Sequence, residues 1–287
     1  MRSTRYASRL PQAHRDVPSA LTKQIKQWET QLGVRLFTPS RAGMALIRAL
    51  EARVPALPAE WDGILRETRS TAGRAARVLR VGFMASAANE ATPHIIAEFA
   101  RRRPGWRVDM RQAAWSEPSA GLTDGNVDAA LVRMPFPGQD ALRTEVLFSE
   151  PRWVALPAGH PLAVREAIPF RELWCEPFVA APPGSGRWRD HWLATDEREG
   201  HPVRIGAVTD RPDDWLSAIA NGYGMALAPA SAARFYARPG IVYRPVSGIG
   251  PHQVGVAWAR ADDTDPVVQD FVRCCLDNRP RPEDVTG

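Results

Sequence analysis

The sequence predicts an α/β protein of two lobes, preceded by a short basic segment. Its 287 residues exceed what one compact core usually contains. Two series of alternating strand-like and helix-like segments fill the later part of the chain, an order typical of parallel sheets covered by helices. The stretch "STAGRAAR", residues 70–77, is small, polar and basic, which is the composition of a linker. We therefore expect a domain boundary at about residue 77.

The N-terminal segment carries the excess positive charge of the chain. Residues 1–80 hold 15 Lys and Arg against 6 Asp and Glu, which leaves 22 against 26 for the remainder. A compact cationic segment attracts polyanions, chiefly through the release of condensed counterions. Nucleic acid is thus a physical candidate for a partner, and a solvated basic surface is the alternative.

A short helix is predicted within "SALTKQIKQWETQLGVRLF", residues 19–37. Its apolar side chains recur at helical spacing and form one buried stripe, consisting of Leu21, Ile25, Trp28 and Leu32. Asp16 is a plausible cap, and Gly33 can end the helix in a left-handed conformation. The opposite face contains Lys23 and Lys26, the two lysines of the chain. Such a face reads DNA or is simply solvated, and periodicity alone leaves both possible.

A second helical pattern covers residues 43–69, where Leu46, Leu50, Leu57, Trp61 and Leu65 are the apolar positions. Pro55 and Pro58 interrupt the pattern, so a single straight helix is not expected.

The first lobe is predicted from the alternation that follows residue 77. Expected strands and helices, in chain order, lie at residues 77–84, 93–105, 106–112, 117–125 and 127–134. A returning strand and a last helix are expected at residues 252–260 and 265–278. The first lobe is accordingly assigned to about residues 78–157 and 258–280.

The second lobe, assigned to about residues 158–257, repeats this alternation. Its expected strands and helices lie at residues 176–182, 186–194, 203–208, 211–222 and 223–231. In such folds a ligand binds between the lobes, at the carboxyl ends of the strands.

Several functional classes find little support in the residue pattern. The three cysteines include the adjacent Cys274 and Cys275, which suit neither a disulfide framework nor a metal site, and the six histidines are scattered. Ser86 lacks the GxSxG context of a hydrolase nucleophile. No apolar run is long enough to span a bilayer, and no secretory signal is readable. We expect a cytoplasmic protein with no catalytic residue, no metal site and no cofactor, and with no membrane partner.

The residues quoted above resemble the LysR-type transcriptional regulators. The segment 19–37 is similar to the recognition helix of that family with its "LGVxLF" end, "TRYASRL" (4–10) to an earlier helix, and "AGMALIRAL" (42–50) to the start of the linker helix. Further matches in the later part are "LRVGF" with Ser86 and Pro93, "RRRPGWRVDM", "GNVDAALVR", "WVALPAGHPLA" and "NGYGMALAPAS".

The resemblance implies a winged helix-turn-helix in residues 1–42, a linker helix and hinge in 43–77, and a two-lobed effector domain like that of periplasmic solute-binding proteins in 78–287. The wing is expected to be mostly missing from "LFTPSRAGMALI" and the head to be shortened at its N-terminus. A homodimer or homotetramer joined through the linker helices is also implied.

The expected DNA contacts divide by type. Ser19, Thr22 and Lys23 lie near the start of the recognition helix and would reach base edges of double-stranded DNA. Lys26 and Arg41 would hold phosphates.

The expected effector site lies between the lobes. Ser86 with Ala87 and Thr209 with Asp210 precede helices whose first amides favour an anion, so a small carboxylate is the expected small-molecule effector. Trp115, Ser116 and Arg133 end or follow strands of the first lobe and are expected to line the same crevice. The hydroxyls of Ser86 and Thr209 would alternatively serve only as helix caps.

The sequence thus favours a DNA-binding regulator whose activity is modulated by a small effector. The alternative is a cytoplasmic solute-binding or sensor protein of the same effector fold with a decayed DNA-binding head. Salt-dependent binding to duplex DNA separates the two.

Overall fold

The computed structural model describes residues 25–27, 29–30, 36–40, 43–46, 57–86 and 88–280. The chain divides into two compact units, residues 1–63 and 64–287, and each is taken by itself below. None of the described helices is both long and apolar enough to cross a membrane.

The first unit contains helical residues and a small hairpin. Residues 25–27 and 29–30 are helical, within the segment where the sequence predicts the recognition helix. Strands β1 (Phe37–Ser40) and β2 (Gly43–Leu46) pair in antiparallel fashion, with Phe37 opposite Leu46. The Glu29 carboxylate accepts hydrogen bonds from the amides of Leu36 (2.8 Å) and Phe37 (3.3 Å) and so joins the helical residues to β1.

This hairpin corrects the prediction for the first residues of the second helical pattern. Gly43–Leu46 is a strand, and a hairpin stands where the sequence was expected to lack most of the wing. The helical spacing of the leucines gives no information about β1. Residues 43–46 form a strand because their backbone groups pair with those of β1.

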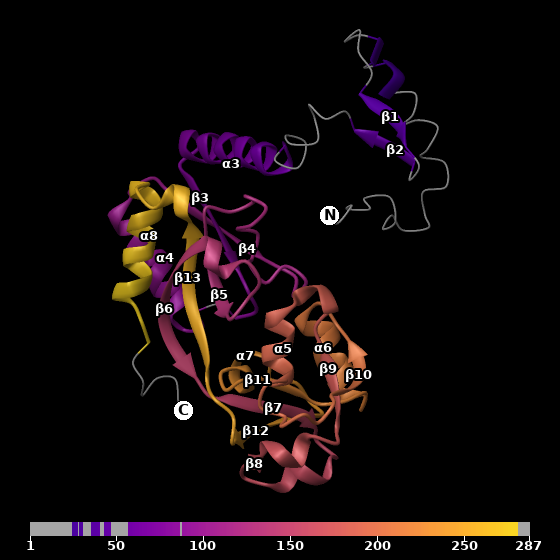
Figure 1. Cartoon of the computed structure of the whole chain (residues 1–287). Helices are drawn as coiled ribbons and strands as arrows, with labels where there is room; N and C mark the ends of the chain where they lie inside the picture. Colours follow the sequence, from indigo (N-terminus) through magenta and orange to yellow (C-terminus); the bar gives the residue numbers. More distant parts are fainter. Residues whose placement is uncertain are drawn as a thin grey trace. The chain divides into compact units, whose positions relative to one another are not determined.

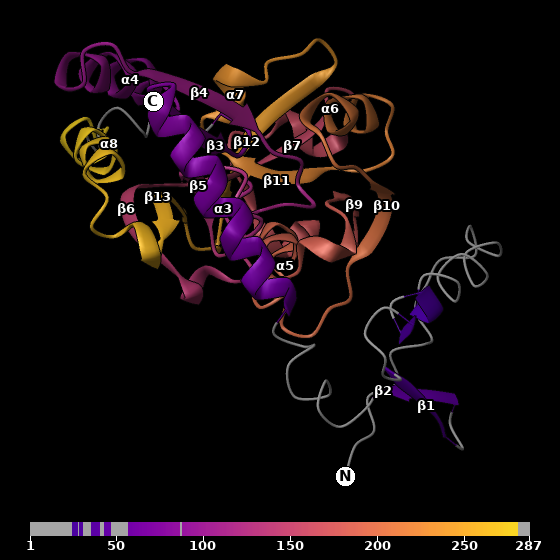
Figure 2. The same cartoon turned by 90° about the horizontal axis from the view of Figure 1, so that it is seen from above.

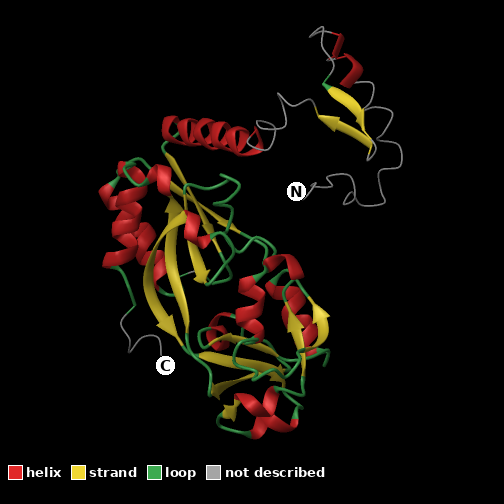
Figure 3. Ribbon diagram, viewed as in Figure 1, coloured by secondary structure: helices red, strands yellow, loops and turns green. Residues whose placement is uncertain are grey.

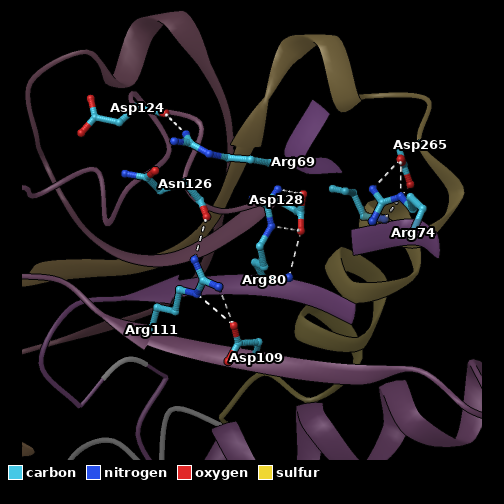
Figure 4. Close-up of polar contacts among 10 residues, drawn as sticks. Arg69, Arg74, Arg80, Asp109, Arg111, Asp124, Asn126, Asp128 and Asp265 are labelled. Atoms are coloured by element: carbon cyan, nitrogen blue, oxygen red, sulfur yellow. Dashed lines mark hydrogen bonds and ion pairs between the residues drawn. The ribbon is translucent and has the colours of Figure 1, made fainter. Parts of the chain in front are cut away.

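Helix α3 (Leu57–Ala75) crosses the expected linker, because it continues through residues 70–75. Pro58 lies in its first turn, where a proline removes no hydrogen bond. Near its other end, Arg69 donates to the carbonyl of Asp124 (3.3 Å) and Arg74 pairs with the carboxylate of Asp265, as Figure 4 shows. These contacts explain why a stretch with linker composition is helical.

The first lobe is built on a five-stranded sheet in the order β4-β3-β5-β13-β6. Strand β3 is parallel to β4 and β5, whereas β13 is antiparallel to both β5 and β6. Helices α4 and α8 pack side by side on this lobe (Figures 1 and 2), with the rings of Phe99 and Phe271 in an edge contact at 5.8 Å. The bounds are β3 Val78–Phe83, α4 Ala91–Arg102, β4 Arg107–Gln112, β5 Ala129–Met134, β6 Leu142–Glu150, β13 His252–Ala259 and α8 Pro266–Asp277.

The second lobe combines a four-stranded sheet, ordered β11-β7-β12-β8, with the parallel pair β10-β9 (Figure 3). Helices α5, α6 and α7 pack against these strands. The bounds are β7 Arg152–Pro157, β8 Ile168–Pro169, β9 Pro177–Ala180, α5 Arg187–Leu193, β10 Arg204–Val208, α6 Pro212–Ala220, β11 Ala226–Pro229, α7 Ala232–Phe235 and β12 Ile241–Ser247.

The sheets place the lobe boundaries a few residues before the expected ones. Strand β7 belongs to the second sheet, although the sequence assigned residues up to 157 to the first lobe. Strand β13 belongs to the first sheet, as expected for the returning strand, and only the boundary at residue 258 lies too late in the chain. The chain therefore crosses between the lobes near residues 151 and 251. Residues 117–125, expected to be helical, form turns instead.

Candidate functional site

A cavity of about 60 Å³ opens between the two lobes. The first lobe contributes Ala85, Trp115 and Arg133, and the rest of the wall comes from the second lobe. A volume of about 10–15 Å³ holds one water, so the cavity has room for a small organic group. The second-lobe residues that line it are Val179, Ala180, Ala181, Trp188, Arg189, Trp192, Leu193, Pro212, Trp215, Ala226, Leu227, Ala228, Pro229, Ala232 and Tyr236.

Four tryptophans form much of this lining. The ring of Trp115 lies 5.9 Å from that of Trp188 and 6.0 Å from that of Trp215, and Trp192 adjoins Trp188 at 6.0 Å. Trp188 and Trp192 come from α5, one helical turn apart, and Trp215 comes from α6. The indole nitrogens of Trp188 and Trp192 are buried without a hydrogen-bond partner. The residues that line the cavity thus provide flat aromatic rings, and two of them carry indole N–H groups without a hydrogen-bond partner.

Arg133, on β5, connects the cavity to Glu150 and His252, which lie at the ends of β6 and β13 where the chain passes between the lobes. Its guanidinium donates to Glu150 (3.0 Å) and to the hydroxyl of Ser86 (3.0 Å), and it contacts Nε2 of the His252 ring. Its Nε atom is buried and has no partner. Glu150 ends β6 and His252 begins β13, so the network stands where the chain passes between the lobes.

The charges of this network are matched. Arg133 is 2 % exposed and Glu150 is fully buried, and a buried charge is tolerated only when it is paired. Burial alone would raise the pKa of Glu150, but the hydrogen bond with His252 and the charge of Arg133 outweigh it and hold that pKa well below its usual range. Burial lowers the pKa of His252 to about 4, so the ring is neutral at pH 7. The pair Arg133–Glu150 is therefore neutral as a whole.

Arg189 is the second cation that lines the cavity. It is half-buried, and its Nε donates to the carbonyl of Ala181 at 2.9 Å. Among the described residues no carboxylate pairs with it, in contrast to Arg133. The cavity thus has a net positive charge.

Direct hydrogen bonds hold the lobes together beside the cavity. The carboxylate of Asp210, which follows β10, accepts from the amide (2.7 Å) and the hydroxyl (2.8 Å) of Ser116. Its carbonyl accepts from the amide of Trp115 (3.0 Å). The sequence predictions for Trp115, Ser116 and Asp210 thus fall on one contact between the lobes.

Comparison with known proteins decides the family. Residues 72–280 match the LysR substrate binding domain. The chain belongs to the LysR-type transcriptional regulator family.

Relatives align over most of their length. The chain is 27% identical to the HTH-type transcriptional regulator AlsR of Bacillus subtilis, over 92% of this chain and 89% of AlsR. It is also 27% identical to the Hca operon transcriptional activator HcaR of Escherichia coli, over 94% of this chain and 90% of HcaR.

Solved structures share the fold. Full-length OxyR from Pseudomonas aeruginosa matches with a TM-score of 0.55 and 22% identity over 90% of each chain. The effector binding domain of QuiR, in complex with shikimate, matches with a TM-score of 0.59 and 14% identity over 70% of this chain and 96% of that chain.

The effector residues expected of this LysR-type regulator take different places. Trp115 and Arg133 line the cavity, whereas Ser116 and Asp210 bond to each other between the lobes and do not line it. Ser86 donates to Asn89 (2.8 Å) and supports Arg133, while the hydroxyl of Thr209 is buried without a partner and does not belong to the lining. Ala87 lies outside the described residues.

The expected DNA contacts lie mostly beyond what the structure describes. Lys26 is described and exposed. Ser19, Thr22, Lys23 and Arg41 lie outside the described residues.

The sequence did not predict the second-lobe wall of the cavity or the partners of Arg133. Trp188, Arg189 and Trp192 form the core of the second-lobe wall, and Glu150 and His252 hold Arg133. One signal was available: "RWRDHW" places two tryptophans four residues apart, on one face of a predicted helix with an arginine beside them. Nothing in the sequence links residues 133, 150 and 252. Among the described residues, no group of His, Cys, Asp and Glu is arranged to hold a metal ion.

Proposed function

We propose that this LysR-type regulator senses a small carboxylate in the cavity between its lobes and couples that binding to the affinity of its N-terminal segment for double-stranded DNA. One observation carries the proposal: the described residues that line the interlobe cavity carry a net positive charge and include buried N–H donors that have no hydrogen-bond partner. Buried donors normally have partners, and a carboxylate supplies acceptors and the matching charge. The protein acts by binding rather than by catalysis.

The expected coupling is a shift between lobe arrangements. A ligand that contacts Arg133 from one lobe and Arg189 from the other prefers the closed lobes, and such a preference shifts their population. Ser86 supports the ligand through Arg133, and Thr209 remains a predicted donor. The QuiR domain, bound to shikimate, is a fold neighbour with a small molecule in complex.

The proposed DNA interface is the basic segment around Lys26. Lys23, with Ser19 and Thr22, would reach base edges, and Lys26 and Arg41 would hold phosphates. A homodimer, joined through the residues of the linker helix, would present two such segments to two half-sites, and a homotetramer would present four. Light scattering of the full chain at micromolar concentration tests the assembly, and a monomer contradicts it.

Fluorescence anisotropy with labelled duplexes tests the DNA proposal. Lys23→Ala is expected to weaken binding to a specific site, whereas Lys26→Ala is expected to weaken binding to any duplex and to reduce the salt slope by about one. Arg165→Ala is the matched control, because Arg165 is an exposed cation of the second lobe that pairs with Glu172. Unchanged titrations for both lysine variants would contradict the interface. Ligand binding without any salt-dependent DNA binding would instead identify the protein as a sensor with a decayed head.

A further inference from the structure

We infer that the interlobe cavity selects a monocarboxylic acid with an apolar tail over the amino acid of the same skeleton, and that Arg189 and Trp188 determine this selectivity. The inference deepens the proposed function, because it names the chemical class of the effector. It rests on which groups of the lining can donate, which can accept and which are already engaged.

Three polar groups on residues that line the cavity are donors that cannot accept, and the hydroxyl of Tyr236 is the side-chain acceptor among the described lining residues. Arg133 Nε and the indole nitrogens of Trp188 and Trp192 are buried and unpartnered. Guanidinium and indole N–H groups have no acceptor capacity. Arg133 and Trp188 are more than nine-tenths buried, at 2 % and 5 % exposure, so water does not readily replace the missing partners. A group with several acceptor lone pairs, such as a carboxylate, completes this set.

The charges around the cavity leave one positive charge that a ligand with a single negative charge would neutralise. Glu150 neutralises Arg133, whereas Arg189 donates to a backbone carbonyl and pairs with no carboxylate among the described residues. A ligand carboxylate next to Arg189 gains a charge-assisted hydrogen bond in a partly desolvated site.

An ammonium group finds no anionic counterpart in the cavity. The described side chains that line it include no carboxylate and no amide, and the hydroxyl of Tyr236 is a neutral acceptor. The two nearby carboxylates are occupied: Glu150 by Arg133, His252 and the amide of Ser231, and Asp210 by Ser116. An amino acid would therefore bury its ammonium next to two guanidinium groups, which is strongly unfavourable.

The remaining lining is apolar and suits an uncharged tail. The indole rings of Trp115, Trp188 and Trp215 approach one another at about 6 Å, and the other lining residues are mainly Ala, Val, Leu and Pro. Burial of a hydrocarbon tail against these walls stabilises the complex, whereas a hydroxyl-rich tail would lose its hydration and gain only the hydroxyl of Tyr236 as a side-chain acceptor among the described lining residues.

Isothermal titration of the full chain tests the selectivity. The probes are butyrate and benzoate, an aliphatic and an aromatic acid, with 2-aminobutyrate and butylamine as the matched amino acid and amine. We expect one or both acids to bind at least about tenfold more tightly than 2-aminobutyrate, and butylamine not to bind. The inference is overturned if neither acid binds, or if 2-aminobutyrate binds as tightly as butyrate.

Two variants assign the selectivity to its residues. Arg189→Gln is expected to weaken the binding of the acid about tenfold or more, and Trp188→Phe, which keeps a ring but removes the N–H, is expected to weaken it several-fold. The control is Arg165→Gln, because Arg165 belongs to the same lobe, is exposed, pairs with Glu172 within that lobe and does not line the cavity. Far-ultraviolet circular dichroism and urea unfolding without ligand check that each variant is folded. Acid binding that is unchanged in Arg189→Gln overturns the role of Arg189, whatever the result for Trp188→Phe.

Failure of this inference differs from failure of the proposed function. If an amino acid or a sugar binds and changes the DNA complex, the proposed regulatory function is supported and the inferred ligand class is wrong. If butyrate or benzoate binds with the expected selectivity but leaves DNA affinity unchanged, the inferred ligand class is supported and the proposed coupling between ligand binding and DNA affinity is wrong.

Discussion

At the scale of residues, the most consequential feature is a buried cluster whose members lie far apart in the sequence. Arg133, Glu150 and His252 come from three strands of the first lobe and meet where the chain crosses between lobes. Arg133 and Glu150 depend on each other, because a charge buried in this cluster is stable only while its oppositely charged partner remains.

Removal of the Glu150 charge should destabilise the fold. In Glu150→Gln the guanidinium of Arg133 stays buried without a carboxylate, which costs about 3–5 kcal/mol in comparable cases. Urea unfolding followed by circular dichroism measures the loss. Glu145→Gln is the control on the same strand, since Glu145 is exposed, and it should change the free energy of unfolding by less than about 0.5 kcal/mol. Equal stability of the two variants would show that the pair is not an essential part of the core.

The buried histidines make stability fall on mild acidification. Burial lowers the pKa of His252 to about 4, and burial together with the charge of Arg152 lowers the pKa of His191 to about 3, from 6.5. Between these folded-state pKa values and pH 6.5, the histidines bind protons in the unfolded chain but stay neutral in the folded chain. The free energy of unfolding therefore decreases as the pH falls through this window.

Urea unfolding at pH 7 and pH 5 measures this loss, which we expect to be about 1–2 kcal/mol per histidine. His191→Asn should reduce the pH dependence, whereas His94→Gln, at an exposed position, should leave it intact. Below about pH 4.5 a further loss follows as Glu150, whose folded pKa is depressed, takes up its proton. An equal pH dependence in His191→Asn and the unaltered protein would contradict the assignment to His191.

At the scale of elements, α3 is attached to the first lobe through the start of α8. Asp265 caps α8 by accepting from the amides of Val267 (2.8 Å) and Val268 (3.2 Å), and it also binds Arg74 of α3. One carboxylate thus fixes two helices, and Figure 4 shows its bonds to Arg74.

Two substitutions separate these roles. Asp265→Asn keeps an acceptor for the α8 amides but loses the ion pair, at an expected cost of about 0.5 kcal/mol because the pair is partly exposed. Asp265→Ala loses the cap as well and should cost about 1 kcal/mol more. Urea unfolding compares the variants. If Asn is as destabilising as Ala, the cap contributes nothing and the ion pair accounts for the whole effect.

At the scale of the whole effector-binding part, the contact between Asp210 and Ser116 should govern how far the lobes open. Asp210→Ala removes both side-chain bonds, so the amide of Ser116 loses its acceptor and exchanges with solvent more often. We expect protection of that amide to fall about tenfold in hydrogen–deuterium exchange, equivalent to a charge-assisted bond at a partly exposed site. Asp196→Ala, at an exposed position of the same lobe, should leave it unchanged. Equal protection in both variants would show that the lobes are held by other contacts.

The sequence by itself determined most elements and their order. Alternating patterns predicted β3, α4, β4 and β5 in one lobe and β9, α5, β10, α6 and β11 in the other, because each element buries a face whose period is readable locally. The exceptions are local as well: Gly43–Leu46 became a strand through pairing with β1, and residues 70–75 continued α3 through contacts with the first lobe.

Only the tertiary structure decided how the site is assembled. Which strands join which sheet depends on long-range pairing, which places β7 in the second sheet although the sequence assigned it to the first lobe. The same pairing brings Glu150 and His252 to Arg133, and lobe packing brings Trp115 to Trp188. A sequence shows the local period of each segment, whereas residues separated by a hundred positions meet only because burial and backbone pairing are satisfied over the whole fold.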